Sequence, residues 1–387
     1  FDTEYLDYKL SVAVAEDVDA AILPAQALTA QGIHDAVAGS MKNAGYDAAT
    51  DSITPEQAGA GFDVAEAQAL LDAASPGETV EIPADIQQPH VTAAELKEVL
   101  FRDVLGQCRT HVSGTSARIN NVKLSAAACN GVVLNTGDVF SYNATTGQRT
   151  PAKGYQAAPA YVGGETVDEV GGGVCQTSST IYYACLRANL EITERYAHRY
   201  VPAYIDWGMD ATVSWGGPDY KFTNNTDYPI KIVATYCGGY LTVKILGTNV
   251  DGTYAKMTNE VLSKTNWETV YKDDETLPAG TEKVTTTPYT GYKVKSYRNV
   301  YSADGKLISS TYEATSDYKV RNKVISRGPA LPEQPETPVT GPAETPVEPP
   351  IQTPEETTPS TTTPETSTLD PSQEQTQTPA QETPAEP

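Results

Sequence analysis

The sequence has little sulfur and little histidine. Its 387 residues include five cysteines, three methionines and four histidines. The cysteines are too few and too widely spaced for a zinc ribbon or a disulfide framework, and their odd number leaves at least one thiol unpaired. They lie at Cys108, Cys129, Cys175, Cys185 and Cys237. The spacings HExxH, CxxC and HxH do not occur, so we expect no metal and no other cofactor.

Long apolar runs and basic residues are also scarce. No run of about 18 apolar residues exists to span a bilayer, and no charged-then-apolar signal peptide opens the chain. Because the first residue is Phe1 and not Met, we expect that an upstream segment carrying a membrane anchor has been removed. The 27 basic residues stand against 50 acidic ones, a net charge of -23, which argues against nucleic acid as a partner.

The acidic charge is concentrated at the C-terminal end. Residues 329–387 hold 11 acidic residues, no Lys or Arg, and 15 of the 27 prolines. Such a segment has almost nothing apolar to bury, so the sequence predicts a disordered Pro/Thr/Glu-rich tail that acts as a spacer. This tail supplies nearly half of the net negative charge.

The rest of the chain predicts a multidomain α+β protein. Residues 1–100 read as a mixed domain of helices and short strands, residues 101–250 as an α+β domain, and residues 251–328 as a small β-rich accessory module. In the first domain, two pairs of residues have the spacing of helix caps, three apolar residues recur at one helical face, and residues 79–83 are predicted to form a strand. These signals are Asp63 with Glu66, Thr92 with Glu95, and Ile33, Val37 and Met41.

Two further segments predict particular elements of the second domain. Residues 118–131 read as a helix that Asn130 and Gly131 end. The sequences PIKIVATYC and LTVKILG flank Gly238 and Gly239, which is a strong β-hairpin signal.

The segment VGGGVCQTSSTIYYACLRAN at 170–189 carries the clearest chemistry. Its glycines allow a tight turn, and the residues after Cys175 have helical spacing, with a stop at Asn189. Cys175 would then lie at a helix N-terminus, which favours a thiolate, and the amides of Gly172, Gly173 and Val174 could receive an oxyanion. The residues alone fit an anion-binding glycine loop with an incidental cysteine equally well.

A cysteine nucleophile needs a base, and His198 is the strongest candidate. We expect Ile192 to Tyr200 to form a strand that brings His198 beside Cys175. His111 is the competing base. For the third member, Asp210, Glu194 and a backbone carbonyl remain open. Zinc catalysis is the rival mechanism. The ligands would be His111, Cys175, His198 and Asp210, but these residues do not have the spacing of a metal-binding motif.

Six motifs of the second predicted domain resemble those of a known family. The series RINN, NTGDVFSYNATTGQRTPAKGY, GGGVCQTSSTIYYA, ITERYAHR, GMDATV and DYKFTNNTDYPIKI runs in order over about residues 101–247 and is similar to the bacterial VanW domain. Residues 1–100 resemble the peptidoglycan-binding domain that often precedes it. The module after residue 250 resembles, more weakly, a small domain that is named for its glycines and often follows the VanW domain.

The resemblance implies a cysteine L,D-transpeptidase of the cell wall, with peptidoglycan stem peptides as partners. It assigns Cys175 as nucleophile and His198 as acid and base, and leaves the third group, for which we favour Asp210, unsettled. Contacts with substrate are expected from residues in or beside the motifs, namely Arg149, Arg195, Arg199, Gln176 and Ser178. A papain-like peptidase and a non-catalytic wall-binding scaffold are the alternatives.

The same resemblance implies an extracytoplasmic protein at the cell wall, held by the membrane anchor expected upstream. An oxidising compartment would permit a disulfide between Cys108 and Cys129, which would leave Cys175 free.

Overall fold

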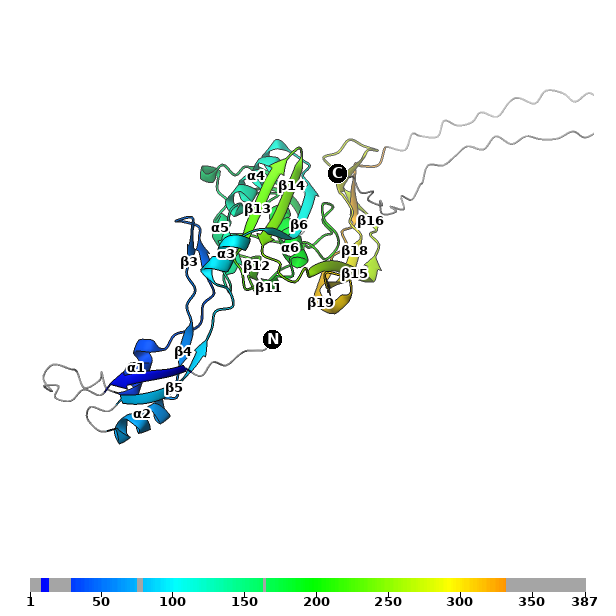
Figure 1. The fold of residues 1–387 in the computed structure, drawn as a ribbon. Coiled ribbons are helices and arrows are strands. Elements are labelled where there is room, and N and C mark those ends of the chain that lie inside the picture. The colour runs from blue at the N-terminus through cyan, green and yellow to red at the C-terminus, as the bar shows by residue number, and fades with distance from the viewer. Residues whose placement is uncertain (1–7, 14–28, 75–78, 163–164, 332–387) are drawn as a thin grey trace, which may run out of the picture. The chain divides into compact units, whose positions relative to one another are not determined.

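The computed structural model describes residues 8–13, 29–74, 79–162 and 165–331 (Figure 1). The described residues form helices and many small sheets, which makes the fold α+β as predicted. Most of the predicted tail, residues 332–387, lies outside the described residues. Among the helices of the described residues, none is long and apolar enough to cross a membrane.

The N-terminal region contains a three-stranded sheet with two short helices. The sheet has the order β1-β5-β4, and α1 packs on α2. Their bounds are β1 Tyr8–Ala13, α1 Ala30–Val37, β4 Gly59–Gly61, α2 Val64–Ala73 and β5 Thr79–Gln87. The Asp63 carboxylate accepts from the Glu66 amide at 2.8 Å, so the predicted N-cap is confirmed. The first helix ends at Val37, so the predicted face does not reach Met41.

A small hairpin and a third helix follow. The hairpin pairs β2, Gly45–Asp47, with β3, Ser52–Thr54, and the helix is α3, Ala93–Val99. Thr92 and Glu95 form the reciprocal capping box that their spacing predicts. The buried Ala44, Val91 and Leu96 join these elements.

The main core of the molecule lies between a four-stranded antiparallel sheet and two helices. The sheet has the order β6-β14-β13-β7, and α4 and α6 pack on it. Its elements are β6 Asp103–His111, β7 Val133–Leu134, β13 Ile230–Cys237 and β14 Tyr240–Gly247. The predicted hairpin is confirmed, with Gly238 and Gly239 at φ 57° and 83°, a backbone region that favours glycine.

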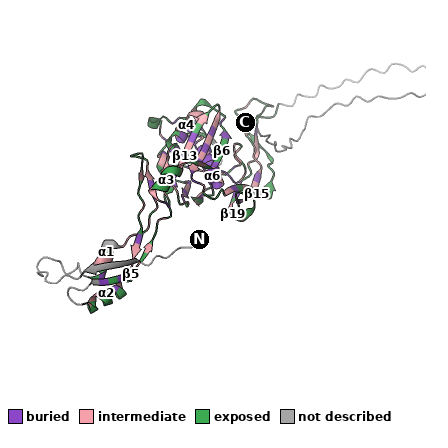
Figure 2. Ribbon diagram, viewed as in Figure 1, coloured by how far each residue is buried: buried purple, intermediate pink, exposed green. Residues whose placement is uncertain are grey.

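Helix α4 spans Ser116–Cys129 and α6 spans Cys175–Arg187. Both match their predicted positions, with Asn130 as the C-cap of α4 and Asn189 at φ 56° after α6. Residues 176–186 of α6 are all buried (Figure 2), so this helix is the centre of the core. Burial on every side fixes its N-terminus firmly in place.

Shorter elements close the same core. Two sheets have the orders β11-β12-β8 and β10-β9. Their bounds, with two short helices, are β8 Val139–Ser141, α5 Tyr142–Thr146, η2 Pro151–Lys153, β9 Ala157–Val162, β10 Glu165–Val170, β11 Glu191–Glu194 and β12 Lys221–Thr223. The strand predicted for residues 192–200 therefore ends at Glu194, and His198 lies in a loop.

The β-rich C-terminal part has two three-stranded sheets, with the orders β15-β18-β19 and β16-β20-β17. Their bounds are β15 Tyr254–Thr265, β16 Thr269–Asp273, β17 Glu282–Thr286, β18 Gly291–Tyr301, β19 Leu307–Tyr318 and β20 Lys323–Arg327. Long pairing of β15, β18 and β19 makes the first sheet the larger surface.

Candidate active site

Cys175 is the first residue of α6 and follows a turn of three glycines. Its side chain is half-buried, and its thiol donates to the Val213 carbonyl at 3.4 Å. The turn is held from α4, because the Asn121 amide donates to the Gly172 carbonyl at 3.0 Å and to the Gln156 carbonyl at 2.8 Å. The fold thus presents the cysteine at the N-terminus of a buried helix.

The backbone of the turn requires glycine at each of the three positions, for one of two reasons. Gly171 and Gly173 have φ of +92° and +104°, which side chains disfavour. A Cβ atom at Gly172 would lie 2.2 Å from the Ala158 carbonyl oxygen, so the backbone there packs too closely for any side chain. The sequence pattern is therefore explained by local geometry.

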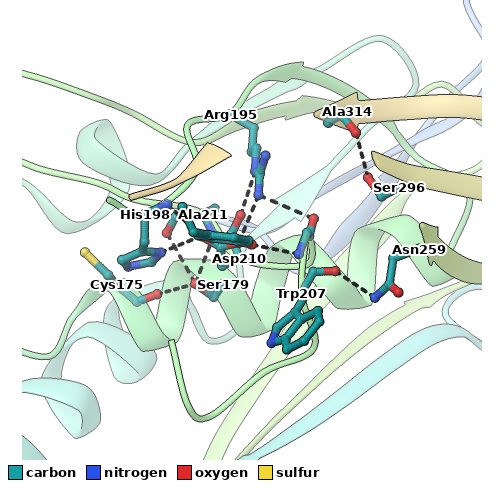
Figure 3. Close-up of polar contacts among 12 residues, drawn as sticks. Cys175, Ser179, Arg195, His198, Trp207, Asp210, Ala211, Asn259, Ser296 and Ala314 are labelled. Carbon is teal, nitrogen blue, oxygen red and sulfur yellow. Dashed lines mark hydrogen bonds and ion pairs between the residues drawn. The ribbon is translucent and has the colours of Figure 1, made fainter. Parts of the chain in front are cut away.

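His198 and Asp210 lie beside the cysteine (Figure 3). The Nδ1 atom of His198 is 2.6 Å from Asp210 Oδ2, and the same oxygen accepts from the His198 backbone amide at 2.7 Å. With Nδ1 held by the carboxylate, Nε2 is the ring nitrogen left for the thiol, and His198 is close enough to Cys175 to lower the pKa of the thiol. The structure thus brings together the three residues that the sequence proposed separately.

The three groups shift one another's protonation. Burial of the Cys175 thiol opposes ionisation, but the hydrogen bond and charge of His198 outweigh it, so the pKa of the thiol is lowered. Burial opposes the charge on His198 too, but Asp210 and Cys175 raise its pKa to about 9. The pKa of Asp210 is held well below its usual range, against burial, by His198 and Arg195. The thiolate of Cys175 and the imidazolium of His198 therefore stabilise each other.

Arg195 contacts Asp210 through its side chain, which is almost fully buried. Its Nη2 lies 3.0 Å from Asp210 Oδ1, its Nε donates to the Asp210 carbonyl at 2.6 Å, and its side chain is 6% exposed. The contact with substrate expected for Arg195 does not fit this placement. The residue orients the carboxylate instead.

Gln176 and Ser178 are also occupied within the core. Gln176 donates to the His111 carbonyl at 2.8 Å, and Ser178 donates to the Ala211 carbonyl at 2.7 Å. Both side chains are buried. The direct substrate contacts expected for them are therefore not compatible with the geometry, because these polar atoms are used to join α6 to its neighbours.

Some backbone amides of the glycine turn already donate hydrogen bonds within the protein, and others are available to an oxyanion. The Gly172 amide donates to the Glu169 carbonyl at 2.9 Å, and the Val174 amide donates to the Gly171 carbonyl at 3.2 Å. Among the described residues, the amides of Gly173 and Cys175 have no acceptor. These two amides, and not the whole loop, are the ones available to an oxyanion.

Two of the expected arginines differ in their access to the site. Arg149 is 9% exposed, donates to Asn143 Oδ1 at 2.7 Å, and helps to lower the pKa of Cys175 through its charge. Its Nε and Nη1 atoms are buried and have no hydrogen-bond partner among the described residues. Arg199 is exposed, one residue after His198, and remains a candidate for substrate contact.

Sequence reasoning missed Arg118 and Tyr204. Arg118 donates to Gln176 Oε1 and to the Ser113 carbonyl, both at 2.8 Å, and its charge interacts with Cys175. The Tyr204 hydroxyl lies 3.5 Å from His198 Nε2. Arg118 opens the RINN motif, which was the one signal for it. Tyr204 carries no motif of its own.

The remaining candidates lie elsewhere or have other partners. The His111 ring packs against Tyr240 at 5.2 Å between centroids, and Glu194 pairs with Lys221 at 2.8 Å. Within the described residues, no group of three or more His, Cys, Asp or Glu side chains is arranged to hold a metal ion.

Cys108 and Cys129, for which a disulfide was considered possible, are not bonded to each other, and all five cysteines are free. Cys108, Cys129 and Cys185 are buried in the apolar core instead.

Fold and site together define an α+β protein with a cysteine, a histidine and an aspartate in contact at the start of a buried helix. Residues 117–246 match the family described as VanW like protein, and residues 256–330 match the G5 domain. The chain therefore contains a VanW-like domain followed by a G5 domain, and the resemblances of residues 101–247 and of the module after residue 250 are confirmed.

Two curated proteins are similar to part of the chain. "Uncharacterized protein YoaR" of Bacillus subtilis is 41% identical over 172 residues, which are 44% of this chain and 56% of that protein. "Vancomycin B-type resistance protein VanW" of Enterococcus faecalis is 29% identical over 123 residues, 30% of this chain and 45% of that protein. The chain thus spans about half the length of these relatives.

Two solved structures are each similar to about a fifth of the chain. An IgA1 protease G5 domain is 17% identical, with 21% of this chain and 98% of that chain covered and a TM-score of 0.16. The HP0197-G5 structure is 21% identical, with 20% and 95% covered and a TM-score of 0.13. The VanW-like and G5 domains together indicate a protein associated with the cell wall.

Proposed function

We propose that the protein is a cysteine L,D-transpeptidase that cross-links peptidoglycan stem peptides outside the cytoplasm. The observation that carries the proposal is the placement of Cys175, at the N-terminus of α6, beside a His198 ring whose Nδ1 is held by Asp210 (Figure 3). This arrangement has the nucleophile, the base and the orienting group that acyl transfer through a covalent intermediate requires.

In the first half of the reaction, the Cys175 thiolate attacks the carbonyl carbon of the third residue of a tetrapeptide stem. The negative oxygen of the tetrahedral intermediate lies toward the amides of Gly173 and Cys175. The bond to the D-Ala nitrogen then breaks, and the His198 imidazolium gives its proton to that nitrogen. A thioester on Cys175 and free D-Ala are the products.

In the second half, the side-chain amine of the third residue of another stem attacks the thioester. His198, now neutral, takes the proton from the attacking nitrogen, and the Cys175 thiolate leaves. The product joins two stems through their third residues. Asp210 keeps Nδ1 of His198 protonated throughout, so Nε2 is the atom that gives and takes the proton.

The charges around Cys175 suit an acidic substrate. Stem peptides carry carboxylates; Arg118 is partly exposed and interacts with Cys175 through its charge, and Arg199 is exposed one residue after His198. In the described residues, neither forms an ion pair with an acidic side chain. We assign them to substrate carboxylates, and we assign to the G5 domain binding to peptidoglycan or its sugars.

The full chain, the Cys175→Ala variant and the Cys237→Ala variant should be incubated with purified tetrapeptide muropeptides and the products followed by mass spectrometry. We expect cross-linked dimers and free D-Ala from wild type and from Cys237→Ala, whose cysteine is exposed at the end of β13. Cys175→Ala should give no dimer, because no other thiol can replace the nucleophile.

Other products would lead to other conclusions. Shortened tripeptide monomers without dimers would show a hydrolase, in which water replaces the acceptor amine. Unchanged muropeptides that still bind to the wild-type protein would show a scaffold without catalysis. Either result would overturn the transferase proposal.

A further inference from the structure

The G5 domain places one of its side chains against the candidate active site. Tyr318, the last residue of β19, is 1% exposed, and its hydroxyl donates to Asp210 Oδ1. The same hydroxyl accepts from the Gly208 amide at 2.7 Å. Tyr318 therefore contacts both the carboxylate that holds His198 and the backbone two residues before it.

The two oxygens of Asp210 have different donors. Oδ2 accepts from the backbone amide and Nδ1 of His198, whereas Oδ1 accepts from Arg195 and Tyr318. His198 and Arg195 belong to the VanW-like domain, so Tyr318 is the donor that comes from outside it. A carboxylate with donors on both oxygens has a fixed plane, and this plane sets the direction of the His198 ring.

Further contacts hold the G5 domain on the loop that carries the site. The Lys319 amide donates to the Arg199 carbonyl at 2.7 Å. Trp207 lies against Tyr292 with 4.4 Å between ring centroids, and Asn259 donates to the Trp207 carbonyl at 3.0 Å (Figure 3). The position of Tyr318 is therefore determined by the packing of β15, β18 and β19 on residues 195–210.

We propose that Tyr318 is a positioning residue for Asp210, so that the active site is shared between the VanW-like and G5 domains. The contribution to catalysis rests on the proposed function, but the contribution to the Cys175 thiolate does not. Attachment of the G5 domain to the wall would then be linked physically to the nucleophile, because both depend on the same docked domain.

Loss of the phenol oxygen should weaken this chain of contacts in a defined direction. Asp210 would keep Arg195 but lose one donor, so its plane would be less restricted and its hold on the His198 imidazolium weaker. The thiolate would lose part of its stabilisation, and a higher pH would be needed to form it. The charged and titratable groups that face Cys175, His198 and Asp210 are Arg118, Arg149, Arg195, Tyr182, Tyr204 and Tyr318.

The test compares Tyr318→Phe with Tyr312→Phe in the full chain. Tyr312 lies in the same strand, is exposed, and contacts Thr315 at 2.9 Å, so it is a matched control. The rate of Cys175 alkylation by iodoacetamide is measured from pH 5 to 10, with Cys237 replaced by alanine in every protein. We expect Tyr318→Phe to raise the midpoint by about one pH unit, and Tyr312→Phe to leave it unchanged.

The muropeptide assay supplies the second readout. We expect dimer formation by Tyr318→Phe to fall about 10- to 100-fold, as is usual when a group that orients a site residue is lost. An unchanged midpoint with unchanged turnover would overturn the proposal. A shifted midpoint with no dimer from any protein, wild type included, would keep the positioning role and reject the transferase.

If thermal unfolding shows that Tyr318→Phe is not folded, a second variant, Asn259→Ala, is tested in its place. Asn259→Ala removes the hydrogen bond to the Trp207 carbonyl from an exposed position, so it loosens the loop without a buried change. We expect a smaller upward shift of the same midpoint. An unchanged midpoint in folded Asn259→Ala would then overturn the proposal.

Discussion

At the scale of the residue, environment separates one cysteine from the others. Burial raises the pKa of the Cys108, Cys129 and Cys185 thiols to about 12, so these cysteines act as small apolar side chains. Burial acts on Cys175 in the same sense, but His198 reverses the result. Reactivity is therefore a property of the partner and not of the residue type.

Replacement of His198 should show this directly. In His198→Gln the burial of Cys175 remains while the stabilising charge is lost, so the pH midpoint of alkylation should rise to at least the ordinary thiol value of about 8.5. His111→Gln is the matched control, since that ring packs against Tyr240. Equal midpoints in wild type and His198→Gln would contradict the assigned ion pair.

The pH dependence of transfer follows from the same pair. As pH rises, activity should first increase, because the Cys175 thiol loses its proton with a pKa below its usual value. It should then fall through about pH 9, where His198 loses the proton needed by the departing amine. A profile of kcat/KM that stays flat between pH 8 and 10.5 would contradict the role of His198 as the acid.

At the scale of the element, close contact between β6 and α6 sets the position of the nucleophile. A Cβ atom at Gly106 in β6 would lie 2.2 Å from the Ala184 carbonyl oxygen of α6. The strand can therefore approach the helix only because residue 106 has no side chain. Cys175, at the start of that helix, depends on this distance.

Gly106→Ala should therefore lower the free energy of unfolding by about 1–3 kcal/mol and reduce the rate of Cys175 alkylation. Gly61→Ala is the control, since no atom lies within 4 Å of a Cβ added there and its φ is not in the left-handed region. Chemical denaturation measures the first effect and iodoacetamide the second. Equal stability of the two variants would mean that β6 and α6 can move apart without loss.

The helices and strands differ in how well the sequence predicted them. The helix after Cys175, the helix after RINN and the Gly238-Gly239 hairpin depend on local signals, namely periodicity, caps and glycine conformations. The strand predicted up to Tyr200 did not form beyond Glu194. There the His198 amide binds Asp210 and the Arg199 carbonyl binds Lys319, and these distant partners outweigh the alternation of side chains.

At the scale of the whole molecule, buried polar contacts join the VanW-like and G5 domains. Arg298 of β18 donates to the Leu190 carbonyl at 2.6 Å and pairs with Glu313 at 2.8 Å. Its side chain is buried, so its loss leaves a carbonyl and a carboxylate without their donor. The two domains should therefore unfold together.

Arg298→Ala should lower the free energy of unfolding by about 2–4 kcal/mol, measured by denaturation with urea. Arg327→Ala is the control, because its pair with Glu282 is exposed and should be worth less than about 1 kcal/mol. A single transition is expected in the wild type. Two separate transitions, one for each domain, would contradict the coupling on which Tyr318 depends.

Sequence patterns alone predicted the order of the VanW-like and G5 domains, the glycine turn and the helix that begins at Cys175. These features depend on residues that are close in sequence, so their signals are local. Tertiary packing places Asp210 against His198, holds Arg195, Gln176 and Ser178 inside the core, and brings Arg118 and Tyr318 to the site. These placements depend on contacts between residues up to 108 positions apart, as between Tyr318 and Asp210, and no local pattern records such contacts.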